Sequence, residues 1–159
     1  MRIERTHDMN AVQTIMHHEK IWDKIHDDGS IEAIPIDSEI LYWLGVYDGD
    51  EMCGFYLLHP VNTACFEMHT CLLPKIWGRK ANEAAILFRD YVFGVIGIKK
   101  LVTNVPESNK IALKYAIKNG MVIEGVNRKS FLKNGILEDQ TMLGMTLEEW
   151  KSCQQQFQH

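Results

Sequence analysis

Several features that mark large protein classes are missing from this sequence. It has no apolar run of the roughly 18 residues that a membrane helix needs, and its first residues, MRIERTHDMN, lack the apolar core of a secretion signal. None of its four cysteines forms a CxxC pair, and no HExxH motif occurs. We therefore expect a cytoplasmic protein that does not enter membranes, with reduced cysteines and no metal site.

Positive charge is also in short supply. The chain has 17 Lys and Arg against 21 Asp and Glu, a net charge of −4. This balance argues against nucleic-acid binding through a broadly basic surface. The length of 159 residues suits one domain with a substantial core. We expect that domain over residues 1–150, followed by a flexible polar tail over 151–159.

What is present is an ordered succession of strand and helix patterns. Apolar residues at helical spacing predict helices over 9–26, over 81–97 and in NKIALKYAIKNG. The turn signals Asp48-Gly49 and KNG predict hairpins. The predicted strands are MRIERT, LYWLGVY, EMCGFYLLHP, TACFEMHTCLL, KKLVTNV, MVIEGVNRKSFL and ILEDQTMLGMT.

This order predicts an α/β protein of the α+β type. Residues 64–105 form a strand–helix–strand unit, which needs a right-handed crossover and a parallel strand pair, whereas the hairpins on either side are antiparallel. We expect a mixed, mostly antiparallel sheet of six to seven strands, with a central parallel pair and helices on both faces. In such sheets ligands bind at the carboxyl ends of parallel strands, beside helix N-termini.

The stretch LLPKIWGRKANEA, residues 72–84, lies at that place. An apolar strand passes through a basic turn into an alanine-rich helix, and the free N–H groups of such a helix start can hold a phosphate. The turn has one glycine, Gly78, where phosphate loops usually have two or three. Two interpretations stay open, an anion cradle and a solvated basic turn.

The residues resemble the GCN5-related N-acetyltransferase superfamily, and most closely the branch that acetylates ribosomal-protein N-termini. The likeness covers about residues 40–150. The chain is also similar to small phage-encoded members of this superfamily, some of which act in virion assembly. That similarity would place the chain in a host cytoplasm or a virion. The matching residues are Pro74, Trp77-Gly78, Glu83-Ala84, Asn109, Ala112, Gly120-Met121 and the segment EGVNRKSFLKNGILEDQTMLGMTLEEW.

The resemblance implies acetyl-CoA as the cofactor. Backbone groups of the strand before the loop would contact the pantetheine arm, and the loop and helix start would hold the pyrophosphate. Asn109 would contact the arm or a bound water, or else be a first-turn residue beside a cap at Ser108. The implied cofactor residues are Cys71, Leu72, Leu73, Gly78, Arg79, Lys80, Ala81 and Asn109.

The loop departs from the family pattern, whichever residue is taken as its central glycine. If Trp77-Gly78 is aligned with the family's Trp-Gly, Lys80 occupies the key glycine position. If Gly78 is the key glycine, Lys75 stands at the Gln or Arg position and Lys80 at the last small one. A side chain there can hinder close backbone approach, whereas the positive charge of Arg79 and Lys80 would attract phosphates.

The strand ACFEMHTCLL carries the candidate catalytic residues. Because strand side chains alternate between faces, Glu67 and His69 share one face with Cys65 and Cys71. A carboxylate beside an imidazole can orient it and raise its pKa, and either group could take a proton from an ammonium. Similar acetyltransferases often draw their base from this strand. The alternative is a solvent-facing polar pair.

Many family members carry a tyrosine that protonates the leaving thiolate. Its position here is Ala116, and Tyr115 stands one residue earlier, about 100° away on a helix. Two functions therefore remain open: acetyl transfer to a protein N-terminus, a lysine or a small amine, and a non-catalytic protein of the same fold, such as a phage assembly or virion component. The oligomeric state is also open.

The acceptor site is expected between the loop over 27–39 and the closing hairpin near 127–139. An acidic rim on this loop would favour a cationic amine. The acids in question are Asp27, Asp28, Glu32, Asp37 and Glu39.

Overall fold

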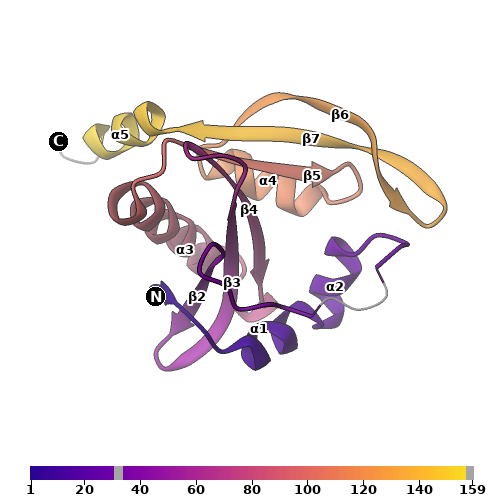
Figure 1. Ribbon diagram of the computed structural model, residues 1–159, viewed down its shortest axis with the longest axis horizontal. Coiled ribbons are helices and arrows are strands. Elements are labelled where there is room, and N and C mark those ends of the chain that lie inside the picture. The colour runs from indigo at the N-terminus through magenta and orange to yellow at the C-terminus, as the bar shows by residue number, and fades with distance from the viewer. Residues whose placement is uncertain (31–33, 157–159) are drawn as a thin grey trace.

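The computed structural model describes residues 1–30 and 34–156 (Figure 1). One curved sheet runs through the molecule, with helices packed against it. The elements are β1 (Arg2–Arg5), α1 (Met9–Met16), α2 (Glu19–Ile25), β2 (Tyr42–Asp48), β3 (Glu51–Pro60), β4 (Cys65–Leu72), the 3₁₀ turn η1 (Pro74–Ile76), α3 (Arg79–Arg89), the π-helix η2 (Asp90–Ile96), β5 (Lys100–Pro106), α4 (Lys110–Lys118), β6 (Val122–Lys133), β7 (Ile136–Thr146) and α5 (Leu147–Gln156).

The strands form a seven-stranded sheet in the order β1-β2-β3-β4-β5-β7-β6. Strands β4 and β5 are the parallel pair, and the neighbouring pairs are antiparallel. Gly49 and Gly135, with φ of 63° and 74°, form the tips of the two hairpins predicted from their turn residues. The predicted mixed, mostly antiparallel sheet with a central parallel pair is confirmed.

Helices cover both faces of the sheet, as predicted. On one face, Val12 and Ile15 of α1 pack with Trp43, Phe55 and Cys71 of the central strands. On the other face, α3 and α4 cover the opposite side chains of the same strands. Figure 1 shows α1 and α2 well separated from α3, with the strands between them. The alternation of strand side chains thus divides the apolar residues into two cores.

Two predicted elements differ from the structure in extent. The helix expected over 9–26 is interrupted, since α2 starts anew with His18 as its N-cap. The helix expected over 81–97 starts earlier, at Arg79, and becomes a π-helix before Gly97 ends it at a φ of 81°. Residues 151–156, expected within a flexible tail, belong to α5. Residues 157–159 of that tail lie outside the described residues.

The parallel pair comes apart soon after it begins. Pairing between β4 and β5 covers three register positions and ends at Glu67 and Val102. Strand β4 nevertheless continues to Leu72 and β5 to Pro106, each still paired on its outer side. The carboxyl ends of the two strands therefore diverge and leave a gap in the middle of the sheet.

All four cysteines are free thiols. Burial raises the pKa of the Cys71 thiol to about 12, so this side chain is a neutral apolar group at neutral pH. None of the helices in the described ranges combines the length and the apolarity needed to cross a membrane.

Strand β3 approaches β4 closely at Gly54. A Cβ at this buried position would lie 2.7 Å from the Cys71 carbonyl oxygen and 3.0 Å from the Leu72 Cα. We predict that Gly54→Ala lowers the free energy of unfolding by about 1–3 kcal/mol, because β4 must shift to admit the methyl group. Urea unfolding measures this loss. Gly94→Ala is the control, since its Cβ would meet Trp150 at 3.6 Å and should cost nothing.

Candidate functional site

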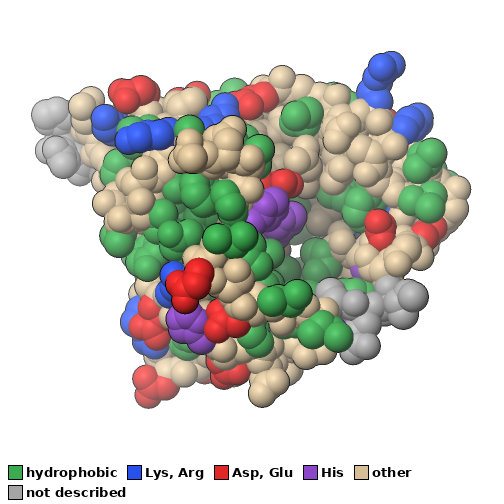
Figure 2. Space-filling model, in the orientation of Figure 1, with side chains coloured by type: hydrophobic (Ala, Val, Ile, Leu, Met, Phe, Trp, Pro, Cys, Tyr) green, Lys and Arg blue, Asp and Glu red, His purple; other side chains and the backbone are tan. Residues whose placement is uncertain are grey.

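The gap between β4 and β5 opens into a cleft of about 660 Å³. Side chains of α1 and α2 line one end, the start of α3 and the inner side of α4 line the other, and Phe131 and Gln140 come from the β6–β7 hairpin. The cleft thus passes through the sheet from one helical layer to the other. Figure 2 shows a hollow near the middle of one face, with histidine and acidic side chains at its edge.

The loop from β4 to α3 forms one wall of this cleft. Residues Pro74–Ile76 make a 3₁₀ turn, and Gly78 then precedes α3 with a φ of 86° and a ψ of −126°. This positive φ suits glycine and strains other residues. Within the described residues no side chain caps α3, so the first N–H groups of the helix are available to an anion. Gly78 and Ala81 both line the cleft.

The lysines of the loop point away from the cleft. Lys80 pairs with Asp48 and Lys75 with Glu51, at the tip of the β2–β3 hairpin. The Asp48 hydrogen bond raises the pKa of Lys80, and Lys80 in turn lowers the pKa of Asp48. Neither lysine lines the cleft, and the exposed Arg79 does not line it either. In this arrangement the groups of the loop that remain available to an anion are backbone N–H groups.

The edge of β4 carries backbone groups that face the gap. Thr103 Oγ1 donates to the Met68 carbonyl at 3.1 Å, and Trp77 Nε1 donates to the Leu72 carbonyl at 2.8 Å. The N–H and C=O of one strand residue point to the same side, and this side alternates from residue to residue. Thr70 lies between Met68 and Leu72 at the same alternation, so its backbone groups also face the gap.

The three predicted backbone-contact residues are therefore placed differently from one another. Leu72 faces the gap, and Cys71 lines the cleft through its side chain while its backbone faces β3. The Leu73 N–H donates to the Cys53 carbonyl at 2.9 Å, so this N–H group is not available to a ligand. Thr70, which sequence reasoning did not single out, supplies the free strand edge instead.

Glu67 and His69 both line the cleft, and the structure adds two residues to this pair. Asn104 Nδ2 on β5 donates to Glu67 Oε1 at 3.1 Å. His59 Nε2 on β3 lies 3.5 Å from Glu67 Oε2 and 3.1 Å from His69 Nε2. The predicted pair is thus part of a four-residue polar cluster at the point where the strands diverge.

The electrostatics of His69 differ from the sequence expectation. Its pKa is lowered, because desolvation of the ring, assisted by His59, outweighs the opposite effect of Glu67. The sequence suggested a raised pKa from the carboxylate alone. A lowered pKa keeps the imidazole neutral near pH 7, so that His69 can accept a proton or a Lewis acid.

One buried polar atom of Asn104 has no hydrogen-bond partner among the described residues. Its amide nitrogen must face Glu67, since a carboxylate can only accept. The Oδ1 atom is then buried without a hydrogen-bond partner among the described residues. Asn104 also lines the cleft, so a ligand N–H there would satisfy it.

Tyr115 lies on the cleft wall although its sequence position is one residue early. Its hydroxyl donates to the Ala81 carbonyl at 2.8 Å and lies 2.7 Å from the Tyr56 hydroxyl. Burial raises the pKa of Tyr115 to about 12, and desolvation also raises the pKa of Tyr56. Ala116, the position of the family tyrosine, is buried and also lines the cleft.

Asn109 caps α4. Its Oδ1 accepts from the Ala112 N–H at 3.2 Å. The N-cap is therefore Asn109, whereas one interpretation of the sequence placed the cap at Ser108. Asn109 also lines the cleft, and a cofactor contact through its remaining polar atoms stays a prediction.

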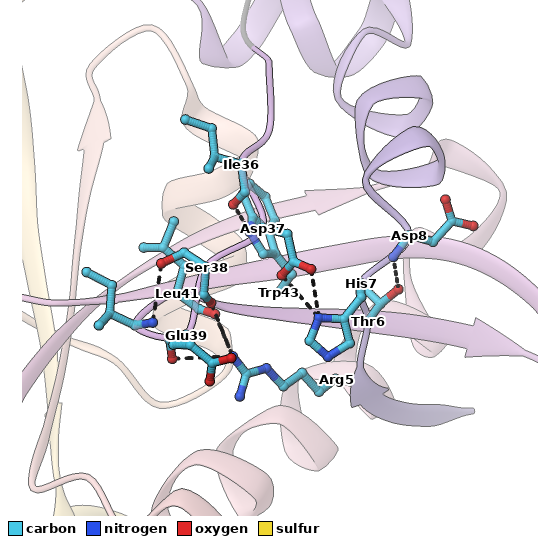
Figure 3. A network of polar contacts seen from close by, with 11 residues as sticks. Arg5, Thr6, His7, Asp8, Ile36, Asp37, Ser38, Glu39, Leu41 and Trp43 are labelled. Atoms are coloured by element: carbon cyan, nitrogen blue, oxygen red, sulfur yellow. Dashed lines mark hydrogen bonds and ion pairs between the residues drawn. The ribbon is translucent and has the colours of Figure 1, made fainter.

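The described residues of the acidic loop, 27–30 and 34–39, do not line the cleft. His7 Nδ1 lies 2.9 Å from Asp37 Oδ2, and Arg5 Nη2 donates to the Leu41 carbonyl at 3.2 Å. Figure 3 shows how these residues lie. Asp28 accepts from the Asn134 and Gly135 N–H groups at the tip of the β6–β7 hairpin. The loop acids therefore hold local structure.

The remaining acids do not change this picture. Asp27 caps its own turn by accepting from the Gly29 N–H at 3.1 Å, and the exposed Glu39 is absent from the cleft wall. Glu32 lies outside the described residues. The charged residues on the cleft wall are instead Glu67, Lys20, Lys24, Lys114 and Lys118, so the expected acidic rim is not found on the described part of the wall.

Sequence reasoning missed His59 and Asn104 for different reasons. His59 lies directly opposite Glu67 in the β3–β4 register, and counting back from the HPVN turn would have found it. Asn104 comes from the parallel partner β5, whose register no turn determines, so only the folded sheet brings it to Glu67.

Comparison with known proteins identifies a family and a fold. A family described as "Protein of unknown function (DUF2824)" matches residues 5–156, and no curated protein matches the chain. A point mutant of the spermidine N-acetyltransferase SpeG from Vibrio cholerae has a TM-score of 0.78 at 16% identity, over 97% of this chain and 99% of that chain.

Two further solved structures are also similar to this chain. A chimera of the Vibrio cholerae enzyme and hSSAT has a TM-score of 0.77 at 16% identity, over 94% of this chain and 97% of that chain. SpeG from Vibrio cholerae in complex with manganese ions has a TM-score of 0.65 at 20% identity, over 72% and 70%. At these identities the likeness shows the fold, which is that of the GCN5-related N-acetyltransferases.

The buried tyrosines give a testable pH dependence. In the unfolded chain Tyr115 ionises near its ordinary pKa of about 10, whereas in the folded protein it does so at about 12. Its contribution to stability is therefore complete below pH 10 and is lost as the pH rises toward 12. We predict that unfolding free energies from urea titrations fall less steeply over this range in Tyr115→Phe than in the wild type. Coincident slopes would contradict the assignment.

Proposed function

The chain belongs to the DUF2824 family, and we propose that it is an N-acetyltransferase that moves an acetyl group from acetyl-CoA to a primary amine. The observation that carries the proposal is the divergence of β4 and β5 after three register positions. It joins an uncapped helix start, a free strand edge and a proton-accepting cluster within one cleft. The likeness to spermidine N-acetyltransferases supports the same chemistry.

The free groups of the cleft suit acetyl-CoA. The N–H groups at residues 79–81 can hold the pyrophosphate in the field of the helix dipole. The strand edge at Thr70 can bind the amides of the pantetheine arm as an added strand would. The buried Oδ1 of Asn104 lacks a donor among the described residues, and an amide N–H of the arm or the amine of the acceptor would supply one. These groups would place the thioester near Glu67.

The transfer itself needs two proton movements. The amine nitrogen attacks the thioester carbonyl carbon, its carbon–sulfur bond breaks, and the thiolate departs. Glu67 or the neutral His69 takes the proton that the amine gives up, directly or through one water. Tyr115 can return a proton to the thiolate, since this residue lines the cleft and its hydroxyl remains protonated at neutral pH; the hydroxyl must then turn from the Ala81 carbonyl.

The acceptor end of the cleft differs from what a polyamine needs. Lys20 and Lys24 of α2 lie on the wall together with Ile21 and Ile25, and Glu67 is the carboxylate of the described wall. Positive side chains disfavour an acceptor with several ammonium groups. We propose an acceptor with one reacting amine, such as a protein N-terminus, a lysine or a small amine. The likeness to the ribosomal-protein branch and to phage-encoded members stays a prediction.

One observation favours the alternative of a non-catalytic protein. Lys75 and Lys80 are both engaged by carboxylates of the β2–β3 hairpin, so the loop directs none of its lysine charge at the cleft. A protein that had lost the cofactor would tolerate this arrangement.

A thermal-shift series separates the two functions. We predict that millimolar acetyl-CoA raises the melting temperature, because it binds the native state, and that the protein then acetylates a peptide or small-amine library. Glu67→Gln should lower kcat by about 10²–10⁴-fold with little change in the affinity for acetyl-CoA. Glu148→Gln, on the exposed face of α5, is the control. The absence of any shift would refute the enzymatic function.

The role of Lys80 is tested separately. Because its ammonium pairs with Asp48 and the cradle consists of backbone N–H groups, we predict that Lys80→Ala changes the Kd for acetyl-CoA by less than about threefold, or about 0.6 kcal/mol. Isothermal titration calorimetry measures it, with Lys151→Ala on α5 as control. A tenfold loss would mean that Lys80 leaves Asp48 to hold the phosphates.

A further inference from the structure

Three side chains with metal-binding atoms meet where the cleft begins. His59 stands opposite Glu67 across the β3–β4 pair, and His69 follows two residues after Glu67 on the same face of β4. Their ligand atoms lie within 4.8 Å of one another. The ring centres of the two imidazoles are 5.2 Å apart, with planes at 14°, and their Nε2 atoms face each other at hydrogen-bond distance.

The separations of these atoms match those of ligands on one small cation. His59 Nε2 lies 3.1 Å from His69 Nε2 and 3.5 Å from Glu67 Oε2. Two ligands that each lie about 2.0–2.1 Å from a zinc ion at a tetrahedral angle are about 3.3–3.4 Å apart. The observed spacing therefore leaves room for a zinc ion among the three atoms with small side-chain rotations.

The surroundings of Glu67 fit a metal ligand. Asn104 Nδ2 donates to its Oε1 at 3.1 Å, which fixes the carboxylate and leaves Oε2 directed at His59. Ligating carboxylates are commonly oriented by such an outer hydrogen bond. Both histidines come from paired strands, so the backbone that carries the three ligands is held by the sheet.

We propose that His59 Nε2, Glu67 Oε2 and His69 Nε2 bind a divalent zinc ion, with a fourth coordination position open to the cleft. Two histidines and one glutamate are a donor set of zinc sites that keep an open position. The sequence contains no HExxH motif, because the ligands come from two strands of a sheet and not from one helix. The site departs from the sequence expectation that no metal is bound.

Metal occupancy has a consequence for acetyl transfer, which rests on the proposed function. A zinc ion takes the electron pairs of Glu67 and His69 that would otherwise accept the amine proton. Bound zinc therefore blocks turnover without filling the cofactor end of the cleft. Acetyl-CoA binding and zinc binding are then compatible, whereas zinc and catalysis are not.

The binding test uses the full chain, freed of metal by a chelator. Cobalt(II) should produce a visible absorption band typical of low coordination number. The band should saturate at one equivalent of cobalt, and added zinc should remove it. Zinc affinity, from competition with a chromophoric chelator at pH 7.5, should fall by more than about 10-fold in His59→Ala and in His69→Ala. Asn104→Ala should weaken it by about 10–100-fold, as losses of outer hydrogen bonds do.

His7→Ala is the matched control, because His7 pairs with Asp37 on the loop side of the molecule. It should leave the zinc affinity unchanged, and circular dichroism should show that each variant is folded. Absence of cobalt absorption, or equal zinc affinity in the wild type and both histidine variants, would overturn the proposal.

The inhibition test compares rates with and without one equivalent of zinc within each variant, so differences in basal rate cancel. Zinc should lower the wild-type rate at least tenfold, and His59→Ala should lose most of this inhibition. Zinc binding in a protein with no turnover under any condition would support the site and contradict the proposed enzyme. Turnover that zinc binding leaves unchanged would overturn the inhibitory role.

Discussion

The separation of β4 from β5 is the constraint on which the rest of the structure depends. A parallel pair in the middle of a sheet would ordinarily satisfy its backbone groups along its whole length. Here pairing ends at Glu67 and Val102, and the edges beyond need other partners. Thr103 and Trp77 satisfy two carbonyls of β4, and the remaining groups face a cleft. The cleft in the middle of the sheet follows from this incomplete pairing.

The same divergence of β4 and β5 explains why polar side chains from several strands lie together around Glu67. Glu67 is the last residue of β4 that pairs with β5, so its side chain lies where these two strands begin to separate. Asn104 reaches it from β5 and His59 from β3. Each of the three central strands thus contributes to one polar cluster. A proton acceptor and a metal site are alternative uses of the same electron pairs, so occupancy by a cation would decide whether the cluster can act as a base.

The basic loop shows how tertiary contacts change the meaning of a sequence motif. In the sequence, Arg79 and Lys80 are the side chains expected to attract phosphates. In the folded protein the β2–β3 hairpin supplies a carboxylate to Lys80, as it does to Lys75, and Arg79 does not line the cleft. What remains for an anion is the uncapped start of α3 behind Gly78, a backbone feature that tolerates the surrounding side chains.

The sequence by itself determined the elements and the sheet type, because side-chain periodicity and turn residues such as Asp48-Gly49 act locally. It also placed Glu67 and His69 on one face, since alternation along a strand needs no tertiary information. Only the tertiary structure decided which groups meet them. The register of β5 against β4 depends on a long crossover, and ion pairs such as Lys80 with Asp48 join residues distant in sequence. Local rules carry no information on such contacts, which form when the whole sheet packs.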